Sequence, residues 1–166
     1  KLLFTGFNGV GKSTLIKSTL KKIPALGGTA TFSPSAKVNY FDQDLEWDDP
    51  SLTPFQMIQN MFPTMQPKTI RQKLARAGIN AANTMKPLHL LSGGEQTKVK
   101  LAILELTPSN FLIMDEPTNH LDDETKEGLK TALQNFPGNL ILVSHEQSFY
   151  EGWLDKILNV EKLSLK

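Results

Sequence analysis

A glycine-rich stretch near the start of the chain limits the folds open to it more than any other feature. Residues 6–14 read Gly-Phe-Asn-Gly-Val-Gly-Lys-Ser-Thr and match the phosphate-binding pattern G-x-x-x-x-G-K-[ST]. The apolar run 2–5 before it is typical of a buried strand, and residues 14–22 carry apolar side chains at helical spacing. Because this P-loop pattern requires a strand, a turn and a helix in that order, the sequence predicts a phosphate site here.

The residue types of this stretch suit the chemistry of a triphosphate. Gly6, Gly9 and Gly11 lack a Cβ, so the backbone can turn tightly and aim its N–H groups inward. The start of the next helix adds free N–H groups and a partial positive charge. Lys12 supplies a full charge for the β- and γ-phosphates, and the Ser13 hydroxyl suits Mg²⁺. The alternative is a glycine-rich turn that carries a lysine by chance, and the flanking strand and helix disfavour it.

Length and composition set wider bounds. The chain has 166 residues, enough for one domain with a core, and its net charge of +1 neither demands nor excludes nucleic acid. The absence of cysteine excludes a disulfide framework, a thiol nucleophile and a cysteine metal site. No apolar run has the length of a membrane span and no signal peptide is visible, so we expect a cytoplasmic protein. Because Lys1 stands where Met would start a chain, we expect a piece of a longer protein.

Strands and helices alternate along the rest of the chain. The spacing of apolar residues predicts helices over residues 53–61, 69–77, 92–106, 123–135 and 147–153. The apolar runs 111–114 and 140–143 are typical of strands in a parallel sheet. Strand-forming residues around turn residues predict a hairpin of 29–32 with 37–41 and a strand or hairpin arm over 156–166, while 80–91 is either a loop or a short helix. The alternation predicts an α/β fold with a largely parallel sheet.

Two carboxylates follow the apolar run 111–114. Asp115 and Glu116 stand at its C-terminal end, the end at which parallel sheets present ligand-binding side chains. With a P-loop in the same chain, this is a Walker B arrangement, in which Asp115 holds Mg²⁺ opposite Ser13. Glu116 can polarise the attacking water as a general base. The alternative, two acidic residues in a solvated turn, is disfavoured by the presence of the P-loop.

Four further motifs resemble those of a known family. Residues 91–96, Leu-Ser-Gly-Gly-Glu-Gln, resemble the signature motif of the ATP-binding cassette (ABC) superfamily. Gln43 follows a predicted strand, as the Q-loop glutamine does in that family. Leu121-Asp122 is similar to the D-loop, and Ser144-His145 is similar to the switch histidine at a strand end. The motifs stand in the family's order, and the resemblance covers essentially the whole chain.

The resemblance implies a fold with two parts. The fold would be an ABC-type nucleotide-binding domain with a P-loop ATPase core, residues 1–48 and 107–166, and a mostly parallel central sheet. Residues 49–106 would form an inserted helical subdomain that carries the signature motif. The N-terminal antiparallel strands of the family, and the aromatic residue that stacks on adenine, would lie upstream of Lys1.

The resemblance also implies roles for individual residues, with ATP and Mg²⁺ as the cofactors. The triphosphate would be bound by the P-loop residues Gly6, Asn8, Gly9, Val10, Gly11, Lys12, Ser13 and Thr14. Mg²⁺ would be arranged by Ser13, Gln43 and Asp115, and the catalytic set would be Glu116, His145 and Gln43. Asp122 would link two sites across a dimer. The γ-phosphate of an ATP held by a second cassette would be capped by Ser92, Gly93, Gly94, Glu95 and Gln96.

One motif resembles a particular branch of the family. Residues 118–122, Thr-Asn-His-Leu-Asp, are similar to the ABC-F proteins, which carry two cassettes in one polypeptide and act on ribosomes. This resemblance implies a second cassette and the ribosome or its RNA as partners, in translation or in protection from antibiotics. Two alternatives stay open. One is the nucleotide-binding subunit of a membrane transporter, and the other is a binding module whose ATP-driven closure matters more than turnover.

Overall fold

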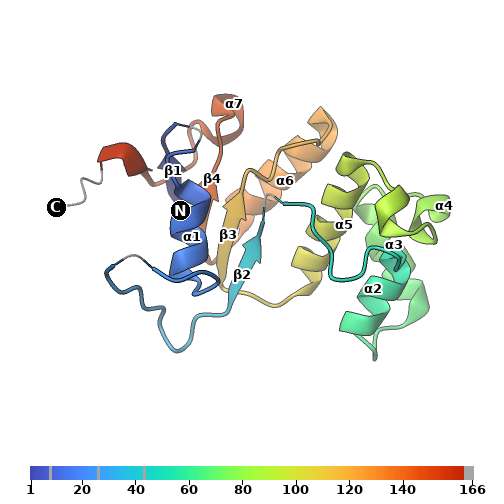
Figure 1. Cartoon of the computed structure of the whole chain (residues 1–166). Coiled ribbons are helices and arrows are strands. Elements are labelled where there is room, and N and C mark those ends of the chain that lie inside the picture. The colour runs from blue at the N-terminus through green and yellow to red at the C-terminus, as the bar shows by residue number, and fades with distance from the viewer. Residues whose placement is uncertain (8, 26, 43, 163–166) are drawn as a thin grey trace.

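One parallel sheet brings the apolar runs of the sequence together. The computed structural model describes residues 1–7, 9–25, 27–42 and 44–162. The strands of this described part are β1 (Leu2–Thr5), β2 (Val38–Phe41), β3 (Phe111–Asp115), β4 (Asn139–Val143) and β5 (Lys156–Asn159). They lie in the order β2-β3-β4-β1-β5, and each neighbouring pair is parallel (Figure 1). The prediction of an α/β fold with a mostly parallel sheet is confirmed.

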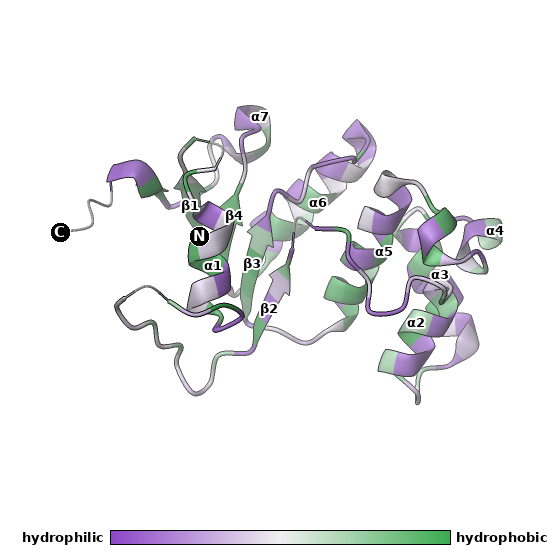
Figure 2. Cartoon of the chain, in the orientation of Figure 1, coloured by the Kyte–Doolittle hydropathy of each residue, from purple (hydrophilic) through white to green (hydrophobic). Residues whose placement is uncertain are grey.

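Helices cover both faces of the sheet, so the strands are hydrophobic on both sides. Successive side chains of a strand point to opposite faces. Accordingly Leu112 and Met114 pack with α6 (Asp123–Asn135) and α7 (Gln147–Tyr150), while Ile113 packs on the other face with α1 (Lys12–Thr19). Figure 2 shows hydrophobic residues dominating β3 and β4, while hydrophilic and hydrophobic residues mix along α6. Burial on both faces is the reason these runs lack the polar alternation of a half-exposed strand.

The chain between β2 and β3 builds a helical group beyond the β2 edge of the sheet (Figure 1). Its helices are α2 (Pro54–Met61), α3 (Pro67–Arg76), α4 (Ala81–Thr84), the 3₁₀ helix Leu88–Leu90 and α5 (Gly93–Leu106). The group has a core of its own, made of Ile58, Ile70, Leu74, Ile79, Leu88, Leu91, Val99 and Ala102. The C-terminal half of α5 instead reaches the sheet, where Leu101 and Leu104 join the core under α6.

Two helices of this group begin with a capping box, in which the first and fourth residues of the motif hydrogen-bond to each other's backbone N–H. At the start of α5, Ser92 Oγ accepts a hydrogen bond from the Glu95 N–H at 3.3 Å, and Glu95 Oε2 accepts one from the Ser92 N–H at 2.9 Å. Thr53 and Gln56 make the same reciprocal pair at the start of α2, at 3.1 and 2.9 Å. Each pair satisfies backbone N–H groups that a helix start leaves without partners.

Several predicted elements differ from those observed. The hairpin was wrong: residues 29–32 form no strand, and Val38–Phe41 joins the sheet as β2, parallel to β3. Residues 80–91 contain both α4 and the 3₁₀ helix at Leu88–Leu90, so the undecided stretch is partly helical. The predicted C-terminal strand is short, because β5 ends at Asn159 and a 3₁₀ turn, Val160–Lys162, follows; residues 163–166 lie outside the described residues.

Among the residues that the structure describes, no helix has both the length and the apolar character needed to cross a membrane.

Candidate nucleotide-binding site

The sheet topology brings three motifs to one edge. Strand β4 lies between β3 and β1, and all three run in the same direction. Val143, the last residue of β4, is level with Phe4 on one side and with Asp115 on the other. The segments that leave these strands therefore start side by side, as at the ligand-binding edge of other parallel α/β sheets. They carry the P-loop, Asp115-Glu116 and His145.

A cavity of about 500 Å³ opens at this edge, lined by Gly9, Gly11, Lys12, Ser13, Thr14, Asp115, Glu116, Asn119, Val143 and His145. Most of these residues were predicted as site residues from the sequence. Gly6 and Val10 belong to the P-loop but do not line the cavity, and Asn8 and Gln43 lie outside the described residues. Asn119 and Val143 were missed as site residues. Asn119 stands in a motif quoted only for its family resemblance, and Val143 has the character of an ordinary core residue.

The P-loop backbone has the shape that its glycines permit. Gly9 and Gly11 adopt φ values of 82° and 97°, a region that residues with a Cβ rarely enter. Gly11 is the residue before α1. The N–H groups in the first turn of α1, which have no partner within the helix, therefore lie beside the cavity. The Lys12 side chain is buried, and its ammonium donates hydrogen bonds to the carbonyls of Gly6 and Phe7 at 2.8 and 3.0 Å. The loop thus holds a positive charge at the cavity wall.

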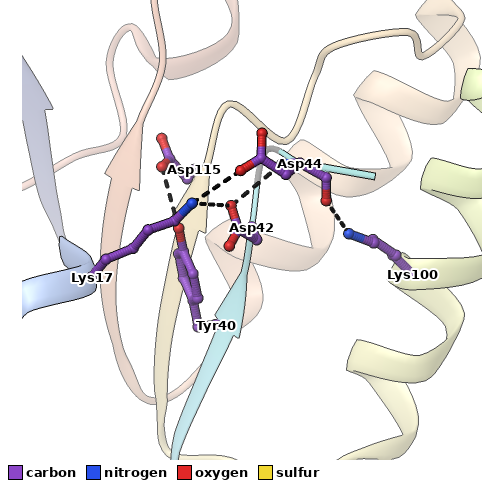
Figure 3. A network of polar contacts seen from close by, with 6 residues as sticks. All are labelled: Lys17, Tyr40, Asp42, Asp44, Lys100 and Asp115. Carbon is purple, nitrogen blue, oxygen red and sulfur yellow. Dashed lines mark hydrogen bonds and ion pairs between the residues drawn. The ribbon is translucent and has the colours of Figure 1, made fainter. Parts of the chain in front are cut away.

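Asp115 is a buried carboxylate with an acceptor to spare. The side chain is fully buried, and the Tyr40 hydroxyl donates to its Oδ2 at 3.4 Å (Figure 3). Oδ1 has no hydrogen-bond partner within the described part of the chain. Burial raises the pKa of Asp115, and the nearby hydroxyls of Ser13 and Tyr40 oppose that rise. An unpaired carboxylate oxygen is costly in a protein interior, and a bound cation would relieve that cost.

Ser13 and Asp115 therefore fit a magnesium ion. Mg²⁺ is usually bound through one or two carboxylates, water and substrate phosphates rather than by a cage of protein ligands. No group of three or more His, Asp or Glu side chains within the described ranges is arranged to hold a metal. A hydroxyl, one buried carboxylate and a neighbouring phosphate loop match that mode of binding, in which the nucleotide supplies the remaining ligands.

The Glu116 and His145 side chains contact each other at the wall of the cavity. The Glu116 N–H donates to the Val143 carbonyl at 2.9 Å, which extends the β3–β4 pairing by one residue. Glu116 itself has a φ of 47°, an unusual value that turns the chain sharply after the strand. His145 Nε2 lies 3.3 Å from Glu116 Oε1, and the His145 N–H donates to Oε2 at 3.4 Å. Burial raises the pKa of Glu116, and His145 lowers it.

The signature residues lie outside this cavity and pack on the turn that follows Glu116. A Cβ added to Gly94 would lie 2.5 Å from the His120 carbonyl oxygen, so this glycine permits a close approach within the chain. Lys98 of α5 pairs with Asp122 at 2.6 Å, and Asp122 caps α6 by accepting from the Thr125 N–H at 2.8 Å. These contacts hold the pKa of Asp122 well below its usual range. The structure thus joins the signature and D-loop segments to each other, away from the P-loop cavity.

Comparison with known families decides which of the P-loop proteins this site resembles. A family described as "ABC transporter" matches residues 1–119, more than half of the chain. The chain belongs to this ABC family. Its members are ATP-binding cassettes, so the predictions of family, of fold and of an ATPase domain are confirmed at that level.

Curated relatives of this ABC chain are longer proteins. It is 36% identical to an uncharacterized ABC transporter ATP-binding protein, YfmM, of Bacillus subtilis, over 95% of this chain and 32% of the relative. It is 39% identical to ATP-binding cassette sub-family F member 3 of Homo sapiens, over 90% of this chain and 21% of that protein. The ABC chain thus spans about a fifth to a third of the length of the relatives it matches.

Solved structures share the fold of this ABC chain. A dimeric, post-hydrolysis state of the ATP-binding cassette MJ0796 bound to ADP and Pi matches with a TM-score of 0.73 at 19% identity, over 95% of this chain and 79% of that one. An archaeal ribosome recycling factor, aABCE1, in complex with the stalk protein aP1, matches with a TM-score of 0.76 at 21% identity, over 95% of this chain and 31% of that one. At such identities the match shows the fold alone.

Proposed function

We propose that this chain is an ATP-hydrolysing cassette of an ABC-F-type protein, in which closure of two cassettes on ATP is coupled to action on the ribosome. The observation that carries the proposal is the relation to human sub-family F member 3 together with the motif Thr-Asn-His-Leu-Asp at residues 118–122. The proposal implies a cytoplasmic protein, because ribosomes work there. It includes the division into a P-loop core and a helical subdomain of residues 49–106.

Within the cassette we assign nucleotide binding to the P-loop side of the cavity. A γ-phosphate beside Lys12 would compete with the Gly6 and Phe7 carbonyls for the ammonium, which lies within the cavity wall and can reach either. Ser13 and Asp115 would hold Mg²⁺, with Gln43 as a further ligand. When bound, the ion would neutralise charge on the phosphates. The N–H groups at the start of α1 would bind the phosphate oxygens.

We assign proton transfer to Glu116. Its Oε1 lies 3.3 Å from His145 Nε2 and accepts no hydrogen bond from the described residues, so this oxygen would accept one from a water molecule in the cavity. The buried position raises the pKa of Glu116, which makes the carboxylate a better proton acceptor than an exposed one. His145 restrains this carboxylate through its ring and its backbone N–H, and its exposed ring is placed to contact a γ-phosphate.

The location of the signature supports a second cassette as partner. Ser92, Gly93, Gly94, Glu95 and Gln96 do not line the cavity that holds Lys12 and Asp115. The N-terminus of α5 offers N–H groups and a partial positive charge, which suit an anion held by another chain or cassette. We therefore propose that these residues cap an ATP in the opposing P-loop, and that Asp122, on the adjoining turn, links the two sites.

A second candidate is the nucleotide-binding subunit of a membrane transporter. The description of the matched family and the name of the Bacillus subtilis relative favour it. In that function the helical group between Pro54 and Gly78 would carry the surface that contacts the membrane subunit. The sequence motif at 118–122 favours the first candidate, since transporter cassettes more often carry Ser-Ala in place of Asn119-His120.

Sedimentation with ribosomes separates the two candidates. The full-length protein would be centrifuged with purified ribosomes through sucrose, without nucleotide, with ATP, and as the Glu116→Gln variant with ATP. We expect pelleting with ribosomes only in the presence of ATP, and most strongly for Glu116→Gln, because hydrolysis releases the closed form. Lys12→Ala is the matched control that should not pellet. Equal sedimentation with and without ribosomes, together with ATP-dependent association with a membrane subunit, would favour the transporter.

A further inference from the structure

We propose that a polar bridge, made of Lys17, Asp42, Asp44, Lys100 and Trp47, positions the signature turn relative to the P-loop helix. The inference rests on the proposed function, and it adds Lys17 and Trp47, neither of which lines the proposed nucleotide cavity, as positioning residues. Asp42, Asp44 and Trp47 lie just after β2, Lys17 lies on α1 and Lys100 on α5; Figure 3 shows all of them except Trp47.

Lys17 makes the connection to the P-loop helix. It lies on α1, and its ammonium contacts Asp44 Oδ2 at 3.0 Å and Asp42 Oδ1 at 3.4 Å (Figure 3). The hydrogen bond to Asp44 raises the pKa of Lys17 above its ordinary value of 10.5, which accords with an ion pair. Lys17 does not line the nucleotide cavity. We therefore assign to its contacts the positioning of the segment after β2 relative to α1.

Lys100 and Trp47 make the connection to the signature helix. The Lys100 ammonium donates to the Asp44 backbone carbonyl and lies 5.4 Å from the centre of the Trp47 ring. The Trp47 indole N–H donates to Gln96 Oε1 at 2.8 Å, and Gln96 is the last residue of the signature motif. Gln96 in turn donates to the Leu91 carbonyl at 3.1 Å, at the other end of that motif. One short segment thus contacts α5 at two successive levels.

The same segment also reaches the carboxylate proposed for Mg²⁺. Tyr40 lies on β2, immediately before the bridge, and its hydroxyl donates to Asp115. Asp42 follows Tyr40 by two residues and pairs with Lys17. Asp115 is therefore joined to the turn that would cap a second cassette's nucleotide by hydrogen bonds, ion pairs, the cation–π contact of Lys100 with Trp47, and the chain itself between Tyr40 and Asp42.

This continuity gives the bridge a specific consequence. Loss of a bridge contact would leave the cavity residues in place but let the signature turn shift relative to the P-loop face. Catalysis is sensitive to such shifts, because aligned groups lose rate steeply when displaced by a fraction of an ångström to an ångström. ATP binding, which uses the cavity, would change little. The expected kinetic effect is a lower kcat with an unchanged KM for ATP.

The test compares two ion pairs of almost equal exposure. Lys17 and Asp44 are 26% and 60% exposed, and the control pair Lys73–Glu105, 2.7 Å apart within the helical group, is 27% and 58% exposed. Exposed ion pairs add little to stability, so Lys17→Met and Lys73→Met should both fold. In the full-length protein, Lys17→Met should lower the steady-state kcat for ATP about tenfold, whereas Lys73→Met should leave kcat and KM at the wild-type values. Lys17→Arg, which keeps the charge, should restore turnover.

Hydrogen exchange gives a readout that is independent of turnover. Without nucleotide, Lys17→Met should speed backbone exchange in residues 44–47 and in the first turn of α5, and Lys73→Met should not. Trp47→Phe, which keeps an aromatic ring but loses the indole N–H bond to Gln96, should also lower kcat, and it serves as the test if Lys17→Met does not fold. Wild-type kcat and exchange in both Lys17→Met and Trp47→Phe would overturn the bridge alone. A wild-type protein without ATPase activity would instead overturn the proposed function.

Discussion

At the scale of single residues, the carboxylate of Asp115, which we propose holds Mg²⁺, lowers the stability of the folded chain at neutral pH. Its side chain is fully buried, and one oxygen has no partner among the described residues. Burial raises its pKa above the ordinary value of 3.8, so the ionised form is less favourable in the folded chain than in the unfolded one. Such a group adds to stability below its ordinary pKa, and this contribution is lost as the pH rises through the folded-state pKa. At neutral pH the carboxylate therefore costs stability.

Replacement of this carboxylate by an amide should separate stability from activity. Without nucleotide at pH 7, Asp115→Asn should unfold at a higher denaturant concentration than wild type, because it removes an unpaired buried charge. The difference should shrink as the pH falls towards 3.8, where the carboxyl becomes protonated. Magnesium-dependent ATPase should fall by orders of magnitude.

Asp48→Asn, at an exposed position, controls for the loss of one negative charge. An Asp115→Asn variant that is less stable than wild type at pH 7 would contradict the cost assigned to the buried carboxylate.

At the scale of elements, the start of α5 is fixed by its contact with the turn after β3. Gly94 lies in the first turn of α5, and a Cβ there would come within 2.5 Å of the His120 carbonyl oxygen. His120 has a φ of 65°, so this turn is already in an uncommon conformation with little room to adjust. Lys98 and Asp122 hold the same two segments together one turn farther along.

Alanine at the two signature glycines should therefore have unequal effects. Gly94→Ala should lower the free energy of unfolding by about 1–3 kcal/mol, because the added methyl group overpacks a backbone contact. A Cβ on Gly93 would have its nearest neighbour, His120 Cγ, at 3.5 Å, which is an ordinary contact. Gly93→Ala should therefore remain close to wild type in stability, as measured by denaturant unfolding. Equal destabilisation by both substitutions would show that the contact with His120 is not the cause.

The helices and strands also show which parts of the fold the sequence alone predicts. Apolar spacing is a local pattern, so the helices α2 and α5 and the strands β3 and β4 were predicted from it within a few residues of their observed bounds. The hairpin failed because its two halves find better partners far along the chain: Val38–Phe41 pairs with β3, and the Phe32 ring packs edge-on against Phe111 at 5.4 Å. Strand propensity indicates that a segment is extended, but it does not indicate which other strand the segment pairs with.

The candidate site was likewise predicted only in part. Motif spacing located Lys12, Asp115, Glu116 and His145, and the parallel order of the strands brings them to one cavity. Lys17 was not predicted, because a lysine on an exposed helical face has no motif and its partners become visible only in three dimensions.

At the scale of the whole molecule, the described part of the chain has a cavity lined by the P-loop and by Asp115 and Glu116, and the signature segment lies outside that cavity. In our proposal the second half of each catalytic site comes from another cassette. ATP would then hold two cassettes face to face, and turnover would require both. The polar bridge would make the two halves of one cassette move together.

The most direct test is the turnover of the Glu116→Gln variant in the full-length protein. Glutamine keeps the shape of the side chain but cannot accept a proton from water, and loss of a general base typically lowers rates by about 10²- to 10⁴-fold. We predict that Glu116→Gln binds ATP as tightly as wild type and retains it in a closed two-cassette form, while steady-state hydrolysis falls in that range. Hydrolysis at the wild-type rate would contradict the assignment of Glu116 and, with it, the proposed use of this cavity.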